Sequence, residues 1–191
     1  MIYTDYITGI LGRFEGKGYS KGYVPCKGGT FYGTGEKGEP FGASGVTIAT
    51  GVDLGQQTKD RLKSMGVSEE TIRVLSPYLG LKTQAAVDAL RNTPLTITGD
   101  QVEEIDRAVH NRYINETAAM FGPLFEAAPK QVQAVAVSLH YQFGIPRRTA
   151  SPGLGLAWDA MRKGDYTAAA VCLTDPKGWS IEHRQYLVRR Q

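Results

Sequence analysis

Two carboxylates in the first third of the chain have the type and setting needed to cut a glycosidic bond. Glu15 comes directly after an apolar helical pattern, and Asp53 lies in a short strand-and-turn segment that also holds Thr47. Such a bond is cut when one carboxyl group donates a proton and a second works on the far side of the sugar. Taken singly, each residue has a simpler interpretation, as a solvated Glu, a Thr on a strand face and an Asp in a turn.

Whether these residues form one catalytic site depends on the pKa of Glu15 and on how Thr47 and Asp53 are placed relative to each other. A carboxylic acid donates a proton at neutral pH only if its pKa is raised, and partial burial and the negative end of a helix dipole both act in that direction. Glu15, at or just past the end of a helix, is placed to receive both effects. Thr47 and Asp53 are six positions apart, so either a continuous strand puts them on one side or a turn at Gly51 brings them together. An ionised Asp beside a hydroxyl group can hold and deprotonate a water molecule.

The elements that carry these residues differ in kind. Residues 2–14 are predicted to form a helix, because apolar side chains recur at helical spacing before Gly16 and Gly18 stop the pattern. The apolar positions are Ile2, Tyr6, Ile10, Leu11 and Phe14. Residues 16–55 hold 12 of the 23 glycines, with short β-favouring runs between turn signals. This stretch predicts a small irregular sheet, the only β-rich part of the chain.

After Gly55 the pattern is helical almost to the end. Helices are predicted at about 57–65, 68–76 with Ser68 as N-cap, 82–92, 98–121, 129–143, 153–163, 165–173 and 180–190. Thr98 and Gln101 form a capping-box pattern at the start of the longest one, which Gly122 and Pro123 end. The helix over 129–143 has the composition of a buried axis.

These patterns predict an α+β fold in a single domain of 191 residues. We expect a β lobe over about 16–55, a helical lobe over about 56–191 with the N-terminal helix of about 2–14, and a cleft between the lobes. Apolar residues make up 41% of the chain, enough to bury a core. Monomeric behaviour is the expectation.

Charge and composition narrow the function classes. The net charge is +3, with 8 basic and 6 acidic side chains in residues 1–65, 6 and 9 in residues 66–137, and 8 and 4 in residues 138–191. The two basic ends could attract anionic envelope polymers, or they could be an ordinary solvated surface. A nucleic-acid-binding domain is a poor alternative, because the charge is modest and no basic helix or RNA-binding aromatic motif is present. No apolar run is long enough for stable membrane insertion, and the N-terminus lacks the form of a signal peptide, so synthesis in the cytoplasm without export by that route is expected.

Other motifs point to no cofactor. Residues 33–38 have the G-x-G-x-x-G spacing, but no helical pattern follows and no βαβ unit surrounds them. His140 lies on the apolar stripe of its helix and reads as a core histidine, while His110 and His183 are isolated, so no metal is expected. Cys26 and Cys172 are expected to be free thiols. Five aromatics near the sheet could stack on sugar rings or pack the sheet equally well: Tyr19, Tyr23, Phe31, Tyr32 and Phe41.

The segment around the second carboxylate resembles a known family. Residues 14–16 read FEG and residues 44–56 read SGVTIATGVDLGQ, which is similar to the muramidase domain of pesticin and its relatives among phage endolysins, within the phage-type lysozyme group. The resemblance implies a lysozyme-like fold in which Glu15 is the general acid and Thr47 and Asp53 position and activate water. Thr precedes Asp here, as in the pesticin branch.

The resemblance is weaker further along the chain. Residues 139–144, which read LHYQFG, resemble the end of a central helix that closes with Asn-x-Gly in relatives, so Gln142 takes the place of the Asn and becomes a candidate sugar-binding residue. Residues 156–166 and the region of Arg184 are also similar to the family.

The resemblance implies an inverting muramidase that cleaves the β-1,4 bond between N-acetylmuramic acid and N-acetylglucosamine in bacterial peptidoglycan, without a cofactor. It would be made in the cytoplasm of a host bacterium and would act on the peptidoglycan of the cell wall or periplasm. Two alternatives stay open: a lytic transglycosylase, which needs no water-activating Asp, and a non-catalytic peptidoglycan-binding or phage structural module. An endolysin, a virion-associated lysin and a bacteriocin or effector domain all fit the sequence.

Overall fold

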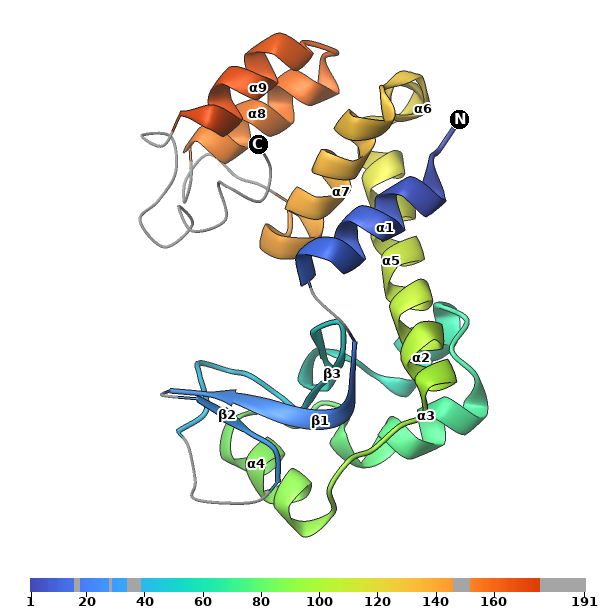
Figure 1. Ribbon diagram of the computed structural model, residues 1–191, viewed down its shortest axis with the longest axis vertical. Coiled ribbons are helices and arrows are strands. Elements are labelled where there is room, and N and C mark those ends of the chain that lie inside the picture. Colours follow the sequence, from blue (N-terminus) through green and yellow to red (C-terminus); the bar gives the residue numbers. More distant parts are fainter. Residues whose placement is uncertain (16–17, 28, 34–38, 146–151, 176–191) are drawn as a thin grey trace. The chain divides into compact units, whose positions relative to one another are not determined.

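The protein has the predicted α+β fold, in which a small antiparallel sheet accompanies a larger number of helices (Figure 1). The computed structural model describes residues 1–15, 18–27, 29–33, 39–145 and 152–175, with Phe14 and Glu15 described by their backbone. Contacts divide the chain into two compact units. The sheet unit comprises residues 15–111, and the helical unit comprises residues 1–14 and 112–191.

The sheet has four strands in the order β2-β1-β3-β4, and all neighbours are antiparallel. The strands are β1 (Tyr19–Cys26), β2 (Gly29–Phe31), β3 (Thr47–Ala49) and β4 (Val52–Asp53). They all lie within the stretch of 16–55 for which the glycine-rich sequence predicts a small sheet. One face of the sheet is apolar and buried, because side chains alternate between the two faces of a strand. The buried residues are Val24, Phe31, Ile48 and Val52.

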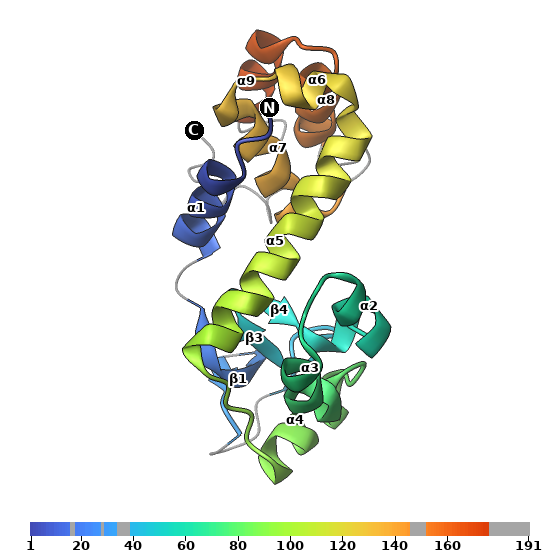
Figure 2. The same cartoon turned by 90° about the vertical axis from the view of Figure 1, so that its right-hand side faces the viewer.

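Short helices complete the sheet unit and lie beside its strands (Figure 2). They are the 3-10 turns η1 (Leu54–Gln56) and η2 (Ser76–Tyr78), and the α-helices α2 (Lys59–Ser64), α3 (Glu69–Leu75) and α4 (Thr83–Asn92). Ser68 caps α3 as predicted, since its hydroxyl accepts the Thr71 N–H at 3.3 Å. Three helices predicted for the helical lobe, α2, α3 and α4, therefore belong to the sheet unit, where α4 contacts β1. Whether the two units form a single domain with a cleft stays a prediction.

Helix α5 (Gly99–Phe121) begins in the sheet unit and continues into the helical unit. Its start is the predicted capping box: the Gln101 N–H donates to the Thr98 hydroxyl at 3.2 Å, and the Thr98 N–H donates to the Gln101 side chain at 3.0 Å. Its end is also as predicted, but the chain turns at Gly122, with φ of 63°, straight into the helix α6 (Pro123–Ala127). The sequence does not predict α6, because Gly-Pro is typical of the end of a helix, although Pro also suits a first helical turn.

The helical unit packs around α7. Its helices are α1 (Thr4–Glu15), α6, α7 (Lys130–Phe143), α8 (Pro152–Arg162) and α9 (Tyr166–Thr174), with α8 beside α9 (Figure 1). The last part of α5 joins them through Ile114 and Phe121. Besides these two residues, the shared core contains Ile7, Leu11, Phe125, Val137, Leu139, Leu154, Trp158, Met161 and Leu173. Gln133 is fully buried in α7 and donates to the carbonyls of Met1 and Ala128 at 3.0 and 3.1 Å. These bonds tie the N-terminus to α7, the predicted buried axis.

Some expectations fall outside the described residues. They include the helix over 180–190, the region of Arg184 and most of the glycine motif over 33–38. Cys26 and Cys172 are both unpaired thiols. In the described part of the chain, no helix is long and apolar enough to cross a membrane.

Candidate active site

The hairpin of β3 and β4 places Thr47 directly opposite Asp53. Side chains of directly opposite residues in an antiparallel pair lie on the same face of the sheet. The turn between the strands depends on Gly51, whose φ of 88° is a conformation that glycine adopts without strain. Of the two arrangements that the sequence allows, the turn at Gly51 is therefore the correct one.

Backbone N–H groups hold one oxygen of the Asp53 carboxylate. Oδ1 accepts the Gly55 N–H at 2.8 Å and the Gly45 N–H at 3.2 Å. Because Asp53 also caps η1, the turn-forming role and the candidate catalytic role fall on the same side chain. The other oxygen, Oδ2, has no hydrogen-bond partner among the described residues. Asp53 is only partly buried, so this oxygen is the group that can accept a proton from water.

Glycines are required on both sides of this carboxylate because the backbone approaches it closely. A Cβ atom at Gly45 would lie 2.5 Å from Asp53 Oδ1, and one at Gly55 would lie 2.9 Å from the same oxygen and 2.6 Å from the Leu81 carbonyl oxygen. Gly45 also contacts Thr47, whose hydroxyl makes a long hydrogen bond of 3.4 Å to the Gly45 carbonyl. One peptide segment thus contacts both candidate residues.

The tip of the hairpin is fixed by Asp106 on α5. The Thr50 N–H donates to Asp106 Oδ1 at 2.9 Å, and the Thr50 hydroxyl makes a short hydrogen bond to the same oxygen. Thr50 is buried, so these bonds form away from solvent, where a lost partner is costly. A Cβ atom at Gly18 would lie 3.0 Å from Asp106 Oδ2, so the start of β1 packs against the same carboxylate. The sequence gives no signal for Asp106, since 56 residues separate it from Thr50.

Two histidines lie in the interior, one in each unit. His110 is buried in α5, and burial lowers its pKa while the nearby Asp106 carboxylate opposes the shift. His140 is buried as predicted, 3.0 Å from the Thr117 hydroxyl through Nδ1. Burial lowers its pKa too, against the raising effect of Glu116. Within the described ranges, no group of three or more His, Cys, Asp and Glu side chains is arranged to hold a metal ion.

The other two candidate residues are placed less completely. Glu15 is the last residue of α1, as predicted, but its side chain lies outside the described part of the structure. Gln142 lies on α7 in the helical unit, partly buried, and its Oε1 atom is buried with no hydrogen-bond partner among the described residues. The structure therefore brings together Thr47 and Asp53, and the roles of Glu15 and Gln142 stay predictions.

A comparison with protein families shows to which family this chain belongs. Residues 5–167 match the family described as "Pesticin: Bacterial toxin homologue of phage lysozyme, C-term". The chain belongs to the pesticin family. The match covers the hairpin and all the candidate residues, and no curated protein sequence matches the chain. As a pesticin-family domain with a lysozyme-like α+β fold, the protein is a lysozyme-type peptidoglycan hydrolase, which makes it a glycoside hydrolase in the broad sense.

Proposed function

We propose that this pesticin-family domain is an N-acetylmuramidase that cleaves the β-1,4 bond between N-acetylmuramic acid and N-acetylglucosamine in the bacterial cell wall. The observation that carries the proposal is the Asp53 carboxylate. Two backbone N–H groups fix its Oδ1 atom, and its Oδ2 atom has no partner among the described residues. A carboxylate held this firmly, opposite a hydroxyl residue, suits the activation of a water molecule.

The chemistry we propose is a single displacement. Water gives a proton to Asp53 Oδ2 while its oxygen attacks the anomeric carbon, and Thr47 helps to orient it. Glu15 gives its proton to the leaving glycosidic oxygen on the opposite face of the sugar, which passes through an oxocarbenium-like transition state. Inversion requires the carboxyl groups to be about 6.5–9.5 Å apart, which leaves room for the water, against about 5–5.5 Å in a retaining enzyme.

Substitution of the two carboxylates tests these roles. We expect Glu15→Gln and Asp53→Asn each to lower the rate of cell-wall lysis, followed by turbidity, by about 100-fold or more, because each removes a proton-transfer group. Glu70→Gln and Asp60→Asn are matched controls on exposed positions and should lyse walls normally. Circular dichroism checks that every variant is folded. A folded Glu15→Gln protein with normal lytic activity would contradict the assignment of Glu15 as the general acid.

The stereochemical outcome tests the mechanism separately. A proton NMR spectrum recorded early in the digestion of soluble glycan strands shows which anomer of the new reducing end forms first. Single displacement at a β bond gives the α anomer first. A β anomer at early times would mean that the enzyme retains configuration, and Asp53 would then not be the base of a single displacement.

A further inference from the structure

The strand register extends the row of candidate residues beyond β3 and β4. Thr47 is paired with Asp53 on one side and with Tyr23 of β1 on the other. Since directly opposite residues share a face, the Tyr23 side chain lies on the same face of the sheet as Thr47 and Asp53.

The row continues to the edge of the sheet. β1 and β2 pair Val24 with Phe31, the last residue of β2, so this antiparallel register, continued by one residue, would set Tyr23 opposite Tyr32. The two rings lie beside each other, as this extension requires, with centroids 5.9 Å apart. Tyr32, Tyr23, Thr47 and Asp53 therefore form one row across the sheet, about 14 Å long at about 4.7–4.9 Å per strand.

The sequence leaves open whether the aromatic residues near the sheet stack on sugar rings or pack the sheet, and their positions on its two faces separate these roles. Phe31 is 3% exposed and belongs to the buried face, where the Arg91 guanidinium lies 5.3 Å from its ring centre. Tyr19 and Tyr32 are 48% and 47% exposed. Phe31 is thus explained by packing in the core, whereas Tyr19 and Tyr32 keep about half of their surface exposed.

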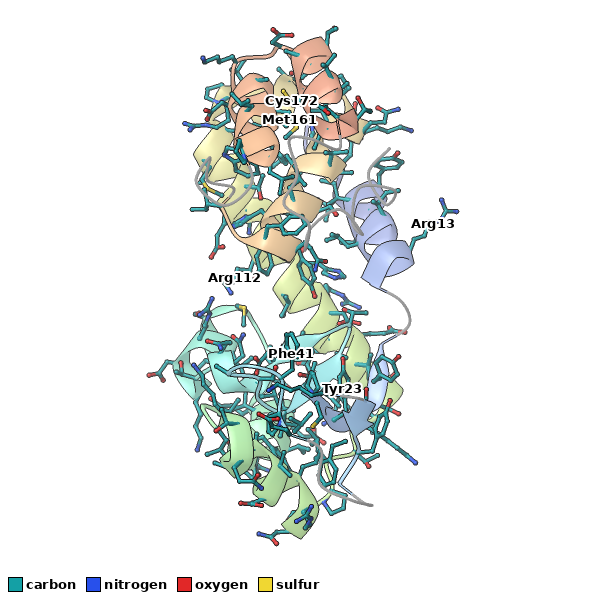
Figure 3. All side chains as sticks on the ribbon, turned by 90° about the vertical axis from the view of Figure 1, so that its left-hand side faces the viewer. Arg13, Tyr23, Phe41, Arg112, Met161 and Cys172 are labelled. Atoms are coloured by element: carbon teal, nitrogen blue, oxygen red, sulfur yellow. The ribbon has the colours of Figure 1, made fainter. Side chains whose placement is uncertain are left out.

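The tyrosine rings form a continuous group. Tyr23 is half-buried between the other two, with its centroid 5.3 Å from that of Tyr19 in an edge-to-face arrangement. Phe41 lies beside the same strand, because its N–H donates to the Pro25 carbonyl at 2.9 Å, and it is 65% exposed (Figure 3). Exposed tyrosines offer apolar ring faces together with hydroxyl groups, which matches the apolar C–H faces and polar rims of sugar rings.

We propose that Tyr19, Tyr23 and Tyr32 form a glycan-binding surface, named here the tyrosine surface, which holds N-acetylhexosamine rings of the strand that leads into Thr47 and Asp53. The inference rests on the proposed function, because the direction of the row has meaning only if Asp53 acts on the glycan. It assigns substrate binding to the sheet itself, apart from the prediction for Gln142.

Binding of chitohexaose, a β-1,4 oligomer of N-acetylglucosamine, tests the tyrosine surface without requiring catalysis. By NMR or calorimetric titration, Tyr19→Ala and Tyr32→Ala should each weaken binding at least about fivefold, the factor for about 1 kcal/mol of lost stacking. Tyr32→Phe keeps the ring and should bind within about twofold of the original protein. Tyr3→Ala is the matched control, since Tyr3 is 41% exposed, lies in the helical unit, and uses only its backbone N–H in its bond to Gln133.

Thermal unfolding checks that the variants are folded. We expect them to fold, because the substituted tyrosine side chains are exposed. If folded Tyr19→Ala and Tyr32→Ala bind like the original protein, or if the original protein binds no chitohexaose, the inference is overturned. The proposed function fails by a different result, absence of wall lysis by the original protein. Glu15→Gln, expected to be inactive in lysis, should bind chitohexaose normally, so the two failures are distinguishable.

Discussion

Replacing Gly45 by alanine tests whether the held position of Asp53 matters for catalysis. The new Cβ atom would lie 2.5 Å from Asp53 Oδ1 and 2.6 Å from the Gly55 nitrogen. Ordinary contact begins at 3.4 Å, so the carboxylate would have to move by roughly 0.9 Å. The Gly55 nitrogen on the other side belongs to the backbone, so it cannot move away as cheaply as the end of a side chain. The Gly45 N–H bond to Asp53 would be strained by the same movement.

The expected effects follow from that displacement. Overpacking of this kind costs about 1–3 kcal/mol of unfolding free energy, or about 2–4 °C of Tm for each kcal/mol in a chain of this size. A misplacement of about 1 Å in a catalytic group can cost on the order of 100-fold in rate. Gly45→Ala should therefore lose far more activity than stability.

Turbidity assays and thermal melts of the same preparations measure both effects. Gly9→Ala makes the same chemical change in α1, where, apart from the neighbouring residues and backbone of the helix itself, no atom of the described residues lies within 4 Å of the added Cβ. It should keep full activity and gain about 0.5–1 kcal/mol of stability, as alanine does in a helix. A Gly45→Ala protein that is folded and lyses walls at the original rate would refute the reasoning.

Two further predictions concern the surroundings of the site and the interior. Asp106→Ala removes the acceptor of both Thr50 hydrogen bonds and should lower the lysis rate about tenfold, with a loss of about 1–3 kcal/mol in the free energy of unfolding. Asp106→Asn keeps an acceptor oxygen and should have smaller effects. An Asp106→Ala protein that lyses walls at the original rate would contradict the positioning role. Burial lowers the pKa of His140 and His110, so below about pH 6.5 the unfolded chain binds protons that the folded chain does not. The free energy of unfolding should therefore fall from about pH 7 to about pH 5. Thermal melts of His140→Gln at several pH values should show a smaller change of Tm with pH, and an unchanged dependence would mean that His140 does not contribute to it.

Features that depend on neighbouring residues could be predicted from the sequence. The caps at Ser68 and Thr98 were found because their hydrogen bonds span only three positions. The ends of α1 and α5 follow from the glycines that stop their patterns. The pairing of Thr47 with Asp53 was half-predictable, since the spacing allowed two arrangements and the φ of Gly51 selected one.

Features that depend on distant segments could not be predicted. Nothing near Asp106 in the sequence indicates that it holds Thr50, because the contact exists only once α5 lies against the hairpin. The tyrosine surface depends on the register of β1, which shifts between Tyr19 and Tyr23 at an irregularity that residue types do not reveal.

The central claim is that Asp53 activates water for hydrolysis of the glycan, and the most direct test follows the oxygen of that water. Purified peptidoglycan is digested in isotopically labelled water, and the soluble muropeptides are analysed by mass spectrometry. The account predicts a reducing N-acetylmuramic acid end that carries the heavy oxygen, and loss of this product in Asp53→Asn. An anhydro-muramyl end without label would contradict it, since that product forms when the sugar closes on itself without water.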